Sequence, residues 1–176
     1  MATISLPSPK TGLKKHPLEV EVQKDCWAWL GSVPVPCSDG TRYGGPSLQD
    51  FSYMVPNGTQ LGGGRTRRAQ YMASLKAQGL KPGVSDIVIA YPIWLPTGGQ
   101  CLYPGAYIEL KRDVGAYKGP AALRSAVRPD QMEWAKRMFS VGYFTAIAYG
   151  VEDFKELVNS YLRHESPRPL DTAPAG

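Results

Sequence analysis

The sequence predicts an α/β fold with a mixed central sheet and helices on both of its faces. Two apolar, β-branched segments, residues 86–91 and 106–112, are separated by a stretch rich in proline and glycine, which favours an antiparallel hairpin. A third such segment, residues 143–149, follows a helical pattern, and a crossover through a helix normally makes two strands parallel. Helical patterns elsewhere in the chain supply the covering layers that such a sheet needs.

Two helices and one short strand are expected in the first half of the chain. Residues 18–30 carry apolar side chains at helical spacing directly after a proline, which predicts an amphipathic helix. Residues 31–64 are rich in glycine, proline and serine, so we expect loops there, with a strand only at residues 51–56. Residues 65–78 contain no helix breaker and are followed by Gly79, which predicts a second helix with a glycine C-cap.

Two further helices are expected in the second half. Residues 115–127 contain several small residues and are expected to form a loop. Pro129 and Asp130 suit the first turn of a helix, which we expect to run to residue 142. The apolar residues between positions 154 and 162 recur at the spacing of one helical face, which predicts the last helix.

The length and composition fit one domain between two flexible ends. The chain has 176 residues, of which 43% are hydrophobic and 20% charged, enough apolar material for a packed core. Proline-containing residues 1–17 and 166–176 predict a flexible lead-in and a disordered tail, which leaves residues 18–165 as the single domain.

The sequence also indicates the compartment. It has no run of about 18 apolar residues, and its start lacks the apolar core of a secretory signal. Three scattered cysteines exclude a disulfide framework and lack the paired spacing of a zinc site. We therefore expect a soluble, cytoplasmic protein.

The net charge of +5 is concentrated in one window of the chain. Between Asp50 and Asp86 there is no acidic residue, whereas five basic residues occur there: Arg65, Arg67, Arg68, Lys76 and Lys81. Such a basic face is the electrostatic footprint of a protein that binds a phosphate backbone. The alternative is an ordinary solvated helix face, because charge alone does not identify nucleic-acid binding.

Charged residues inside the predicted strands indicate a metal site. Glu109 and Lys111 are two residues apart on one strand and so point to the same face, while Asp86 opens the neighbouring strand of the hairpin. Two carboxylates held close together repel each other unless a cation lies between them. A hard divalent ion such as Mg²⁺ or Mn²⁺ resolves this repulsion and activates water for attack on phosphorus. The alternative is a structural salt bridge of Lys111 with either acid, because the E-x-K spacing is common.

The motifs occur in a specific order along residues 18–162. They are a Pro56-Asn57-Gly58 turn, a basic helix at residues 65–78, a glycine-containing strand entry at residues 79–86, Glu109-Leu110-Lys111 on a strand, and Pro129-Asp130-Gln131 at a helix start. In this order the chain resembles the VRR-NUC family of the PD-(D/E)xK nuclease superfamily, which also contains Holliday-junction resolvases. The resemblance implies a restriction-endonuclease-like core. Ser85 stands where the family usually has proline, and serine can adopt the same extended conformation, so we expect the site to be kept.

The resemblance also implies roles for individual residues. Asp86 and Glu109 would be metal ligands, with the backbone carbonyl of Leu110 as a further ligand. Lys111 would position the nucleophilic water. Gln131 would contact the site from the start of the next helix, although a polar first-turn residue is the simpler interpretation.

The family also has an acidic residue on its first helix, and two candidates are present here. Glu19 and Gln23 share a helix face, whereas Glu21 points about 200° away from Glu19, so we prefer Glu19 as the catalytic residue and metal ligand. The alternative for Glu19 is an acid that stabilises the first turn through the helix dipole.

Other residues are candidates for DNA contacts. Asn57 belongs to a turn that lies near the site in the resembling family. Phosphate contacts are expected from the basic window, namely Arg65, Arg67, Arg68, Lys76 and Lys81. The four tryptophans could stack on unpaired bases, although such residues more often belong to the core.

The expected function is therefore a metal-dependent DNA endonuclease that hydrolyses phosphodiester bonds by in-line attack of water. The resemblance implies branched or structured DNA as the substrate, as in junction resolution and DNA repair, and a phage origin. A homodimer is expected, because cutting two strands gains from two-fold symmetry. The alternatives are a DNA-binding or partner-binding protein that keeps the fold without cutting, and an exonuclease or nicking enzyme. The residues leave open whether one or two metal ions bind.

Overall fold

The computed structural model describes residues 16–35, 45–55, 65–96 and 99–172. Within these residues, four strands form the central sheet in the order β1-β2-β5-β6. They are β1 (Ser52–Met54), β2 (Ile87–Ile89), β5 (Ala106–Lys111) and β6 (Phe144–Tyr149). Strand β2 pairs antiparallel with both β1 and β5, while β5 and β6 are parallel. The predicted mixed sheet, with its hairpin and its helical crossover, is confirmed.

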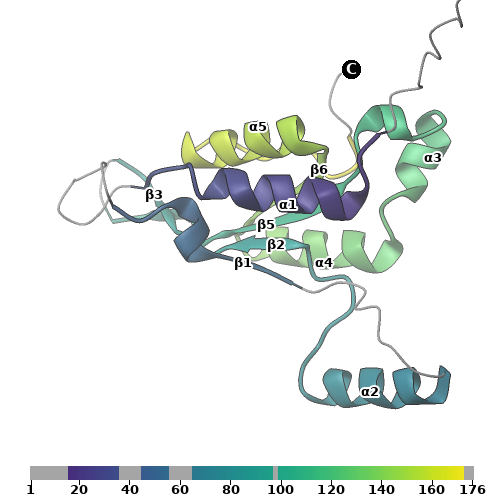
Figure 1. The fold of residues 1–176 in the computed structure, drawn as a ribbon. Coiled ribbons are helices and arrows are strands. Elements are labelled where there is room, and N and C mark those ends of the chain that lie inside the picture. Colours follow the sequence, from purple (N-terminus) through teal and green to yellow (C-terminus); the bar gives the residue numbers. More distant parts are fainter. Residues whose placement is uncertain (1–15, 36–44, 56–64, 97–98, 173–176) are drawn as a thin grey trace, which may run out of the picture.

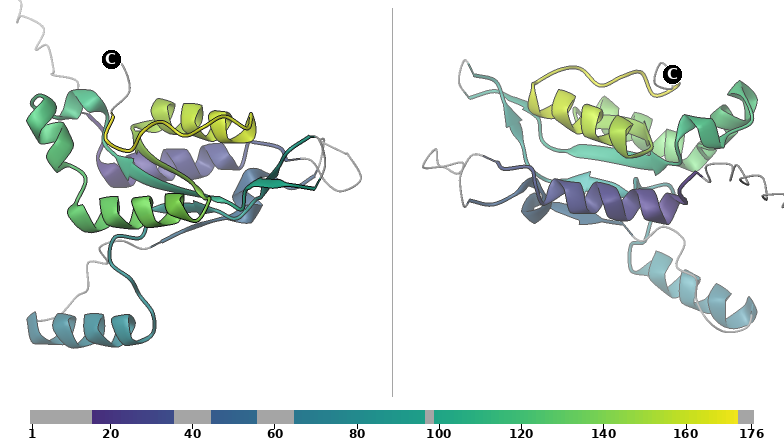
Figure 2. Two further views of the ribbon diagram at one scale, coloured as in Figure 1. Left: turned by 180° about the vertical axis from the view of Figure 1, so that it is seen from behind. Right: turned by 45° about the horizontal axis from the view of Figure 1, so that its top comes forward.

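Helices cover both faces of the sheet, as Figures 1 and 2 show. Helices α1 (Glu19–Leu30) and α5 (Val151–Leu162) pack together on one face. Helix α4 (Pro129–Ser140) packs on the other face against β5 and β6. The α/β architecture expected from the sequence is therefore observed.

The core fills the space between the sheet and helices α1 and α5. Strand β5 is buried along almost its whole length, as expected for a central strand that is covered on both sides. Its Ile108 and Leu110 side chains belong to the apolar core, which also contains Val22 of α1 and Phe154 of α5. On the opposite face of β5, the Tyr107 ring meets the edge of Trp134 on α4. Alternate residues of β5 thus face different layers, and this places Glu109 and Lys111 on the side of α4.

Two segments that we expected to be irregular are ordered. The interval between β2 and β5 holds a second, two-stranded sheet, β3 (Ile93–Trp94) with β4 (Cys101–Tyr103). The predicted loop at residues 115–127 contains helix α3 (Pro120–Ser125) and, just before it, the 3-10 turn η2 (Val114–Ala116). The loop prediction was wrong because Gly119, at φ +87°, lets the chain turn into Pro120 at the first helical position. The 3-10 turn η1 (Leu48–Phe51) precedes β1.

The chain after α5 also differs from the prediction. We expected disorder from residue 166 on, but Arg168 forms an ion pair with Asp153 at 2.8 Å and donates a hydrogen bond to the carbonyl of Ile147. Residues 166–172 therefore lie against the domain, held by a charge pair that no local pattern indicates. Residues 1–15, most of the predicted lead-in, and residues 173–176 are outside the described residues.

The basic helix forms as predicted. Helix α2 (Arg65–Ala77) is followed by Gly79 at φ +104°, a conformation that favours glycine. Figure 1 shows α2 standing apart from the sheet and its covering helices. Among the described residues, no helix combines the length and the apolar character that crossing a membrane requires.

Candidate metal centre

Three carboxylates from separate parts of the chain converge at one end of the sheet. Glu19 is the first residue of α1, Asp86 directly precedes β2, and Glu109 lies on β5. One carboxylate oxygen of each lies within 4.8 Å of the other two. Asp86 and Glu109 are only 6% and 2% exposed, whereas the Glu19 side chain is 51% exposed. The cluster is therefore buried on the sheet side and open on the side of α1.

The strand register explains why Asp86 and Glu109 meet. Ile87 of β2 pairs with Ile108 of β5, and continuing this antiparallel register by one residue places Asp86 opposite Glu109. The Asp86 carboxylate also accepts a hydrogen bond from the backbone N–H of Leu110 at 2.8 Å. Asp86 is thus held by the backbone of the strand that carries Glu109. The ligand role of the Leu110 carbonyl stays a prediction.

Glycine at position 83 brings the entry of β2 against α4. Gly83 has φ +80°, and a Cβ atom there would lie 2.3 Å from the carbonyl oxygen of Asp130. Only a residue without a side chain allows this approach. The strand entry that carries Asp86 can therefore pack directly on the first turn of α4, next to Gln131.

Lys111 links two of the acids. Its Nζ lies 2.6 Å from Glu109 Oε1 and 3.7 Å from Glu19 Oε1. The prediction that Glu109 and Lys111 point the same way is confirmed. Burial by itself lowers the pKa of Lys111, but the charges of Glu109, Glu19 and Asp86 outweigh burial and raise this pKa above its usual value. The lysine is therefore a fixed cation inside the cluster.

Gln131 has two roles that the sequence presented as alternatives. Its Nε2 donates a hydrogen bond to Glu109 Oε1. Its Oε1 accepts a hydrogen bond from the backbone N–H of Arg128 at 3.0 Å, which caps the start of α4. The cap fixes the amide, so that its nitrogen faces the carboxylate.

Glu109 has the features of a carboxylate that can bind a cation. Burial, together with the negative charge of Asp86, raises the pKa of Glu109 to about 8, although Lys111 opposes this shift. Its second oxygen, Oε2, is buried without a hydrogen-bond partner among the described residues. A buried carboxylate oxygen normally has a partner, and hard divalent cations bind carboxylate oxygens. The three acids therefore fit a divalent cation.

The two candidate acids of the first helix have different surroundings. Glu19 joins Asp86 and Glu109. Glu21 instead accepts a hydrogen bond from the backbone N–H of Leu18 at 2.6 Å, and so caps α1. The geometry separates these two residues as the helical spacing predicted.

Arg112 and Tyr117 make contacts next to Lys111 and the start of α1, and sequence reasoning missed both of them. Arg112 follows Lys111, and its guanidinium donates hydrogen bonds to the carbonyls of Pro17 at 3.0 Å and His16 at 3.1 Å. Its backbone N–H donates to the Tyr117 hydroxyl at 3.2 Å. The partners of the guanidinium are almost one hundred residues away in sequence, so no local pattern could have indicated these contacts.

The structure describes the side chains of three of the residues predicted to contact DNA. Arg67, Lys76 and Lys81 are exposed. Arg65 and Arg68 also lie on α2, and Asn57 falls outside the described residues. Phosphate binding by these residues stays a prediction.

The tryptophans mostly pack within the protein. Trp27 and Trp29 are partly buried against the core, and Trp134 contacts Tyr107. Trp94, on β3, is 54% exposed. The core interpretation therefore fits three of the four.

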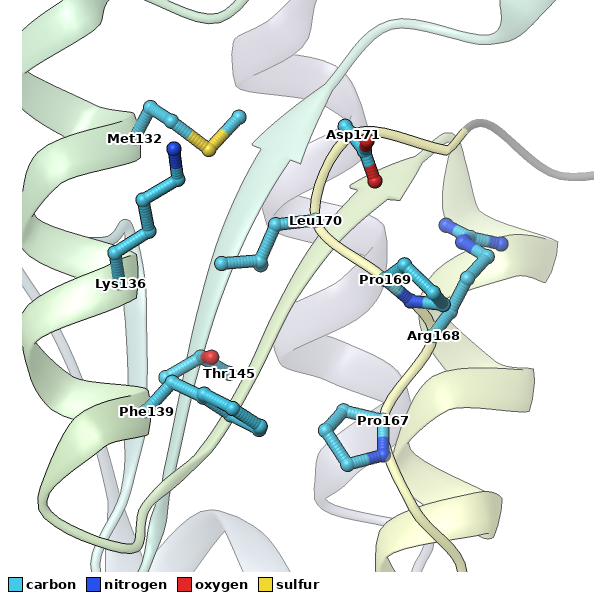
Figure 3. A pocket seen from close by; sticks show the side chains of 9 residues that line it. All are labelled: Met132, Lys136, Phe139, Thr145, Pro167, Arg168, Pro169, Leu170 and Asp171. Atoms are coloured by element: carbon cyan, nitrogen blue, oxygen red, sulfur yellow. The ribbon is translucent and has the colours of Figure 1, made fainter.

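A separate cavity of about 480 Å³ lies between α4 and residues 167–171 of the tail. Figure 3 shows it lined by mostly apolar side chains, including Met132, Phe139 and Leu170. None of the three clustered carboxylates lines this cavity. It is therefore distinct from the candidate metal centre.

A comparison with solved structures identifies a similar protein, described as a VRR_NUC domain protein. The match covers 90% of this chain and 98% of that chain, with a TM-score of 0.59 and 20% sequence identity. The chain has the VRR-NUC fold. The restriction-endonuclease-like core that the motifs implied is therefore confirmed. No family model and no curated protein matches the sequence, so what the VRR-NUC fold does in this chain must be inferred from its own side chains.

Proposed function

We propose that the protein is a divalent-metal-dependent endonuclease that hydrolyses phosphodiester bonds in DNA. The observation that carries this proposal is the convergence of Glu19, Asp86 and Glu109 around Lys111, with a buried Glu109 oxygen that lacks a partner. Hydrolysis of a phosphodiester needs positive charge that offsets the negative charge of the phosphate as water attacks. Carboxylates that hold a cation next to a fixed ammonium group can supply this positive charge.

Each residue of the cluster has a proposed role. Asp86, Glu109 and Glu19 hold the cation, with the Leu110 carbonyl as a further ligand. When bound, Mg²⁺ or Mn²⁺ supplies a Lewis acid that activates water and offsets phosphate charge. Lys111 donates hydrogen bonds that orient the attacking water. Gln131 holds Glu109 in the orientation in which its second oxygen faces the cation.

We further propose branched or structured DNA as the substrate and a homodimer as the active form. The resemblance to junction resolvases supports the substrate, and the exposed basic residues Arg67, Lys76 and Lys81 support contact with its backbone. The resemblance also suggests that a phage encodes the protein and that it acts in the reducing cytoplasm of the bacterial host.

Cleavage assays test this function. The purified protein is incubated with a labelled four-way junction, a flap and a linear duplex, each in Mg²⁺, Mn²⁺ or EDTA. We expect cleavage of the junction that EDTA abolishes and that Lys111→Met lowers by at least about 100-fold. Lys155→Met, which removes a lysine that pairs with Glu152 on α5, should cleave like the wild type.

Four results would contradict parts of the proposal. Salt-sensitive binding without cleavage in either metal would identify a DNA-binding protein instead. Equal cleavage of junction and duplex would exclude the preference for structured DNA, and products shortened stepwise from the ends would indicate an exonuclease. If analytical ultracentrifugation shows that a single copy of the protein is bound to a junction that it cleaves, the homodimer is excluded.

A further inference from the structure

Glu19 differs from the other two carboxylates of the metal centre in how it is held. Asp86 and Glu109 are positioned by the hydrogen-bonded sheet, whereas Glu19 lies on α1 and is half exposed. It is also the first residue of that helix. Its place in the cluster therefore depends on where the chain enters α1.

Arg112 contacts the backbone at this entry. It directly follows β5, which ends at Lys111, and its guanidinium reaches the chain just before α1. Its Nε donates to the carbonyl of Pro17 at 3.0 Å and its Nη2 to the carbonyl of His16 at 3.1 Å. These two carbonyls lie two and three residues before Glu19.

A second contact supports the same junction. A Cβ atom at Gly115 would lie 2.8 Å from Cε1 of His16, so the turn after β5 packs closely on the residue that Arg112 binds. The Tyr117 hydroxyl, from the same turn, accepts the backbone N–H of Arg112. The turn after β5 thus contacts both the chain before α1, at His16, and the backbone of Arg112.

We propose that Arg112 is a positioning residue of the metal centre, which sets Glu19 beside Asp86 and Glu109 by holding the backbone of His16 and Pro17. This inference rests on the proposed metal-binding function. The planar fork of arginine suits two neighbouring carbonyls, whereas the compact ammonium group of lysine lacks this fixed geometry. Residues that orient metal ligands without touching the metal typically contribute 10- to 100-fold in metal affinity.

The test measures Mn²⁺ affinity by calorimetry in the absence of DNA, for wild type, Arg112→Ala, Glu19→Gln and the double variant. We expect Arg112→Ala to weaken Mn²⁺ binding by roughly 10-fold or more. The double variant should bind no more weakly than Glu19→Gln, because both changes remove the contribution of the same carboxylate. Arg112→Lys, which keeps one donor group, should lie between wild type and Arg112→Ala.

The matched control is Arg163→Ala, which removes an arginine that pairs with exposed acids at the end of α5. It should leave Mn²⁺ affinity unchanged. If Arg112→Ala does not fold, the same cycle is measured with Arg112→Lys and Arg112→Gln, and circular dichroism verifies the fold of every variant.

The results separate this inference from the proposed function. Losses that add in the double variant, or an unchanged affinity in Arg112→Ala, would overturn the positioning role while the metal centre stands. A wild type that binds no Mn²⁺ would overturn both. Wild-type binding of Mn²⁺ without DNA cleavage would overturn the nuclease function alone.

Discussion

The amide of Gln131 donates a hydrogen bond to Glu109 while its other end caps the helix from which it projects. The strand residue and the helix residue are separated by 22 positions in the chain. One side chain therefore joins the start of α4 to the least solvated acid of the metal centre. Variants can test this contact, the metal centre around it and the packing elsewhere in the domain.

Gln131→Ala should impair the metal centre more than it impairs the fold. Loss of the hydrogen bond to Glu109 should weaken Mn²⁺ affinity by roughly 10-fold or more. Loss of the cap should cost about 1 kcal/mol of unfolding free energy. Asp130→Ala is the control, because Asp130 lies in the same turn and pairs with Arg128 but is not a member of the carboxylate cluster. An equal loss of Mn²⁺ affinity in both variants would show that only the helix start matters.

Gly83→Ala should destabilise the protein strongly. The new methyl group would lie 2.3 Å from the Asp130 carbonyl, and the backbone at φ +80° disfavours any side chain. Gly79→Ala is the control, because φ is +104° there but nothing lies within 4 Å of the added atom. In urea titrations we expect a loss of about 1 kcal/mol for Gly79→Ala and a clearly larger loss for Gly83→Ala. Similar losses for the two variants would rule out close packing at Gly83.

A divalent cation should stabilise the folded protein, because it relieves the repulsion between buried acids. At a Mn²⁺ concentration 100 times the dissociation constant, the gain is about 2.7 kcal/mol, visible as a higher melting temperature. Asp86→Asn should melt at a higher temperature than wild type in EDTA, and Mn²⁺ should raise its melting temperature less. Glu133→Gln, on the exposed side of α4, should respond to Mn²⁺ like the wild type. If Mn²⁺ leaves the melting temperature of the wild type unchanged, the carboxylate cluster does not bind the cation as proposed.

Arg168→Ala should destabilise the domain although Arg168 lies in the tail. The substitution leaves Asp153, whose side chain is 9% exposed, without its cation and frees the Ile147 carbonyl. We expect a loss of about 2 kcal/mol in chemical unfolding. Arg163→Ala, whose carboxylate partners are 67% and 49% exposed, should destabilise the protein clearly less than Arg168→Ala does. Equal effects would show that the tail is not held by this pair.

Local patterns in the sequence were sufficient to predict the central strands and the faces on which their charged residues lie. The alternation of strand side chains placed Glu109 and Lys111 on one face, and the hairpin placed Asp86 beside them. The resemblance together with the helical spacing favoured Glu19 over Glu21, and in the structure Glu19 lies in the carboxylate cluster whereas Glu21 caps α1. These properties follow from the side-chain periods of strands and helices, two and 3.6 residues, which depend only on the local backbone.

Local patterns failed where a stretch rich in proline, glycine or small residues still forms regular structure, and where a segment is held by a partner distant in the chain. The β3–β4 pair and α3 lie in stretches rich in proline, glycine or small residues that read as loops. The tail is held in place by Arg168 reaching Asp153.

The sequence by itself determined the type and order of the main strands and helices, and which acids and which lysine share a face. Only the tertiary structure decided how these residues are held. Arg112 binds the entry of α1, Gly83 lets the Asp86 strand entry approach α4, and Gln131 fixes Glu109. The physical reason is that periodicity is a property of the local backbone, whereas these contacts exist only after distant segments have packed together.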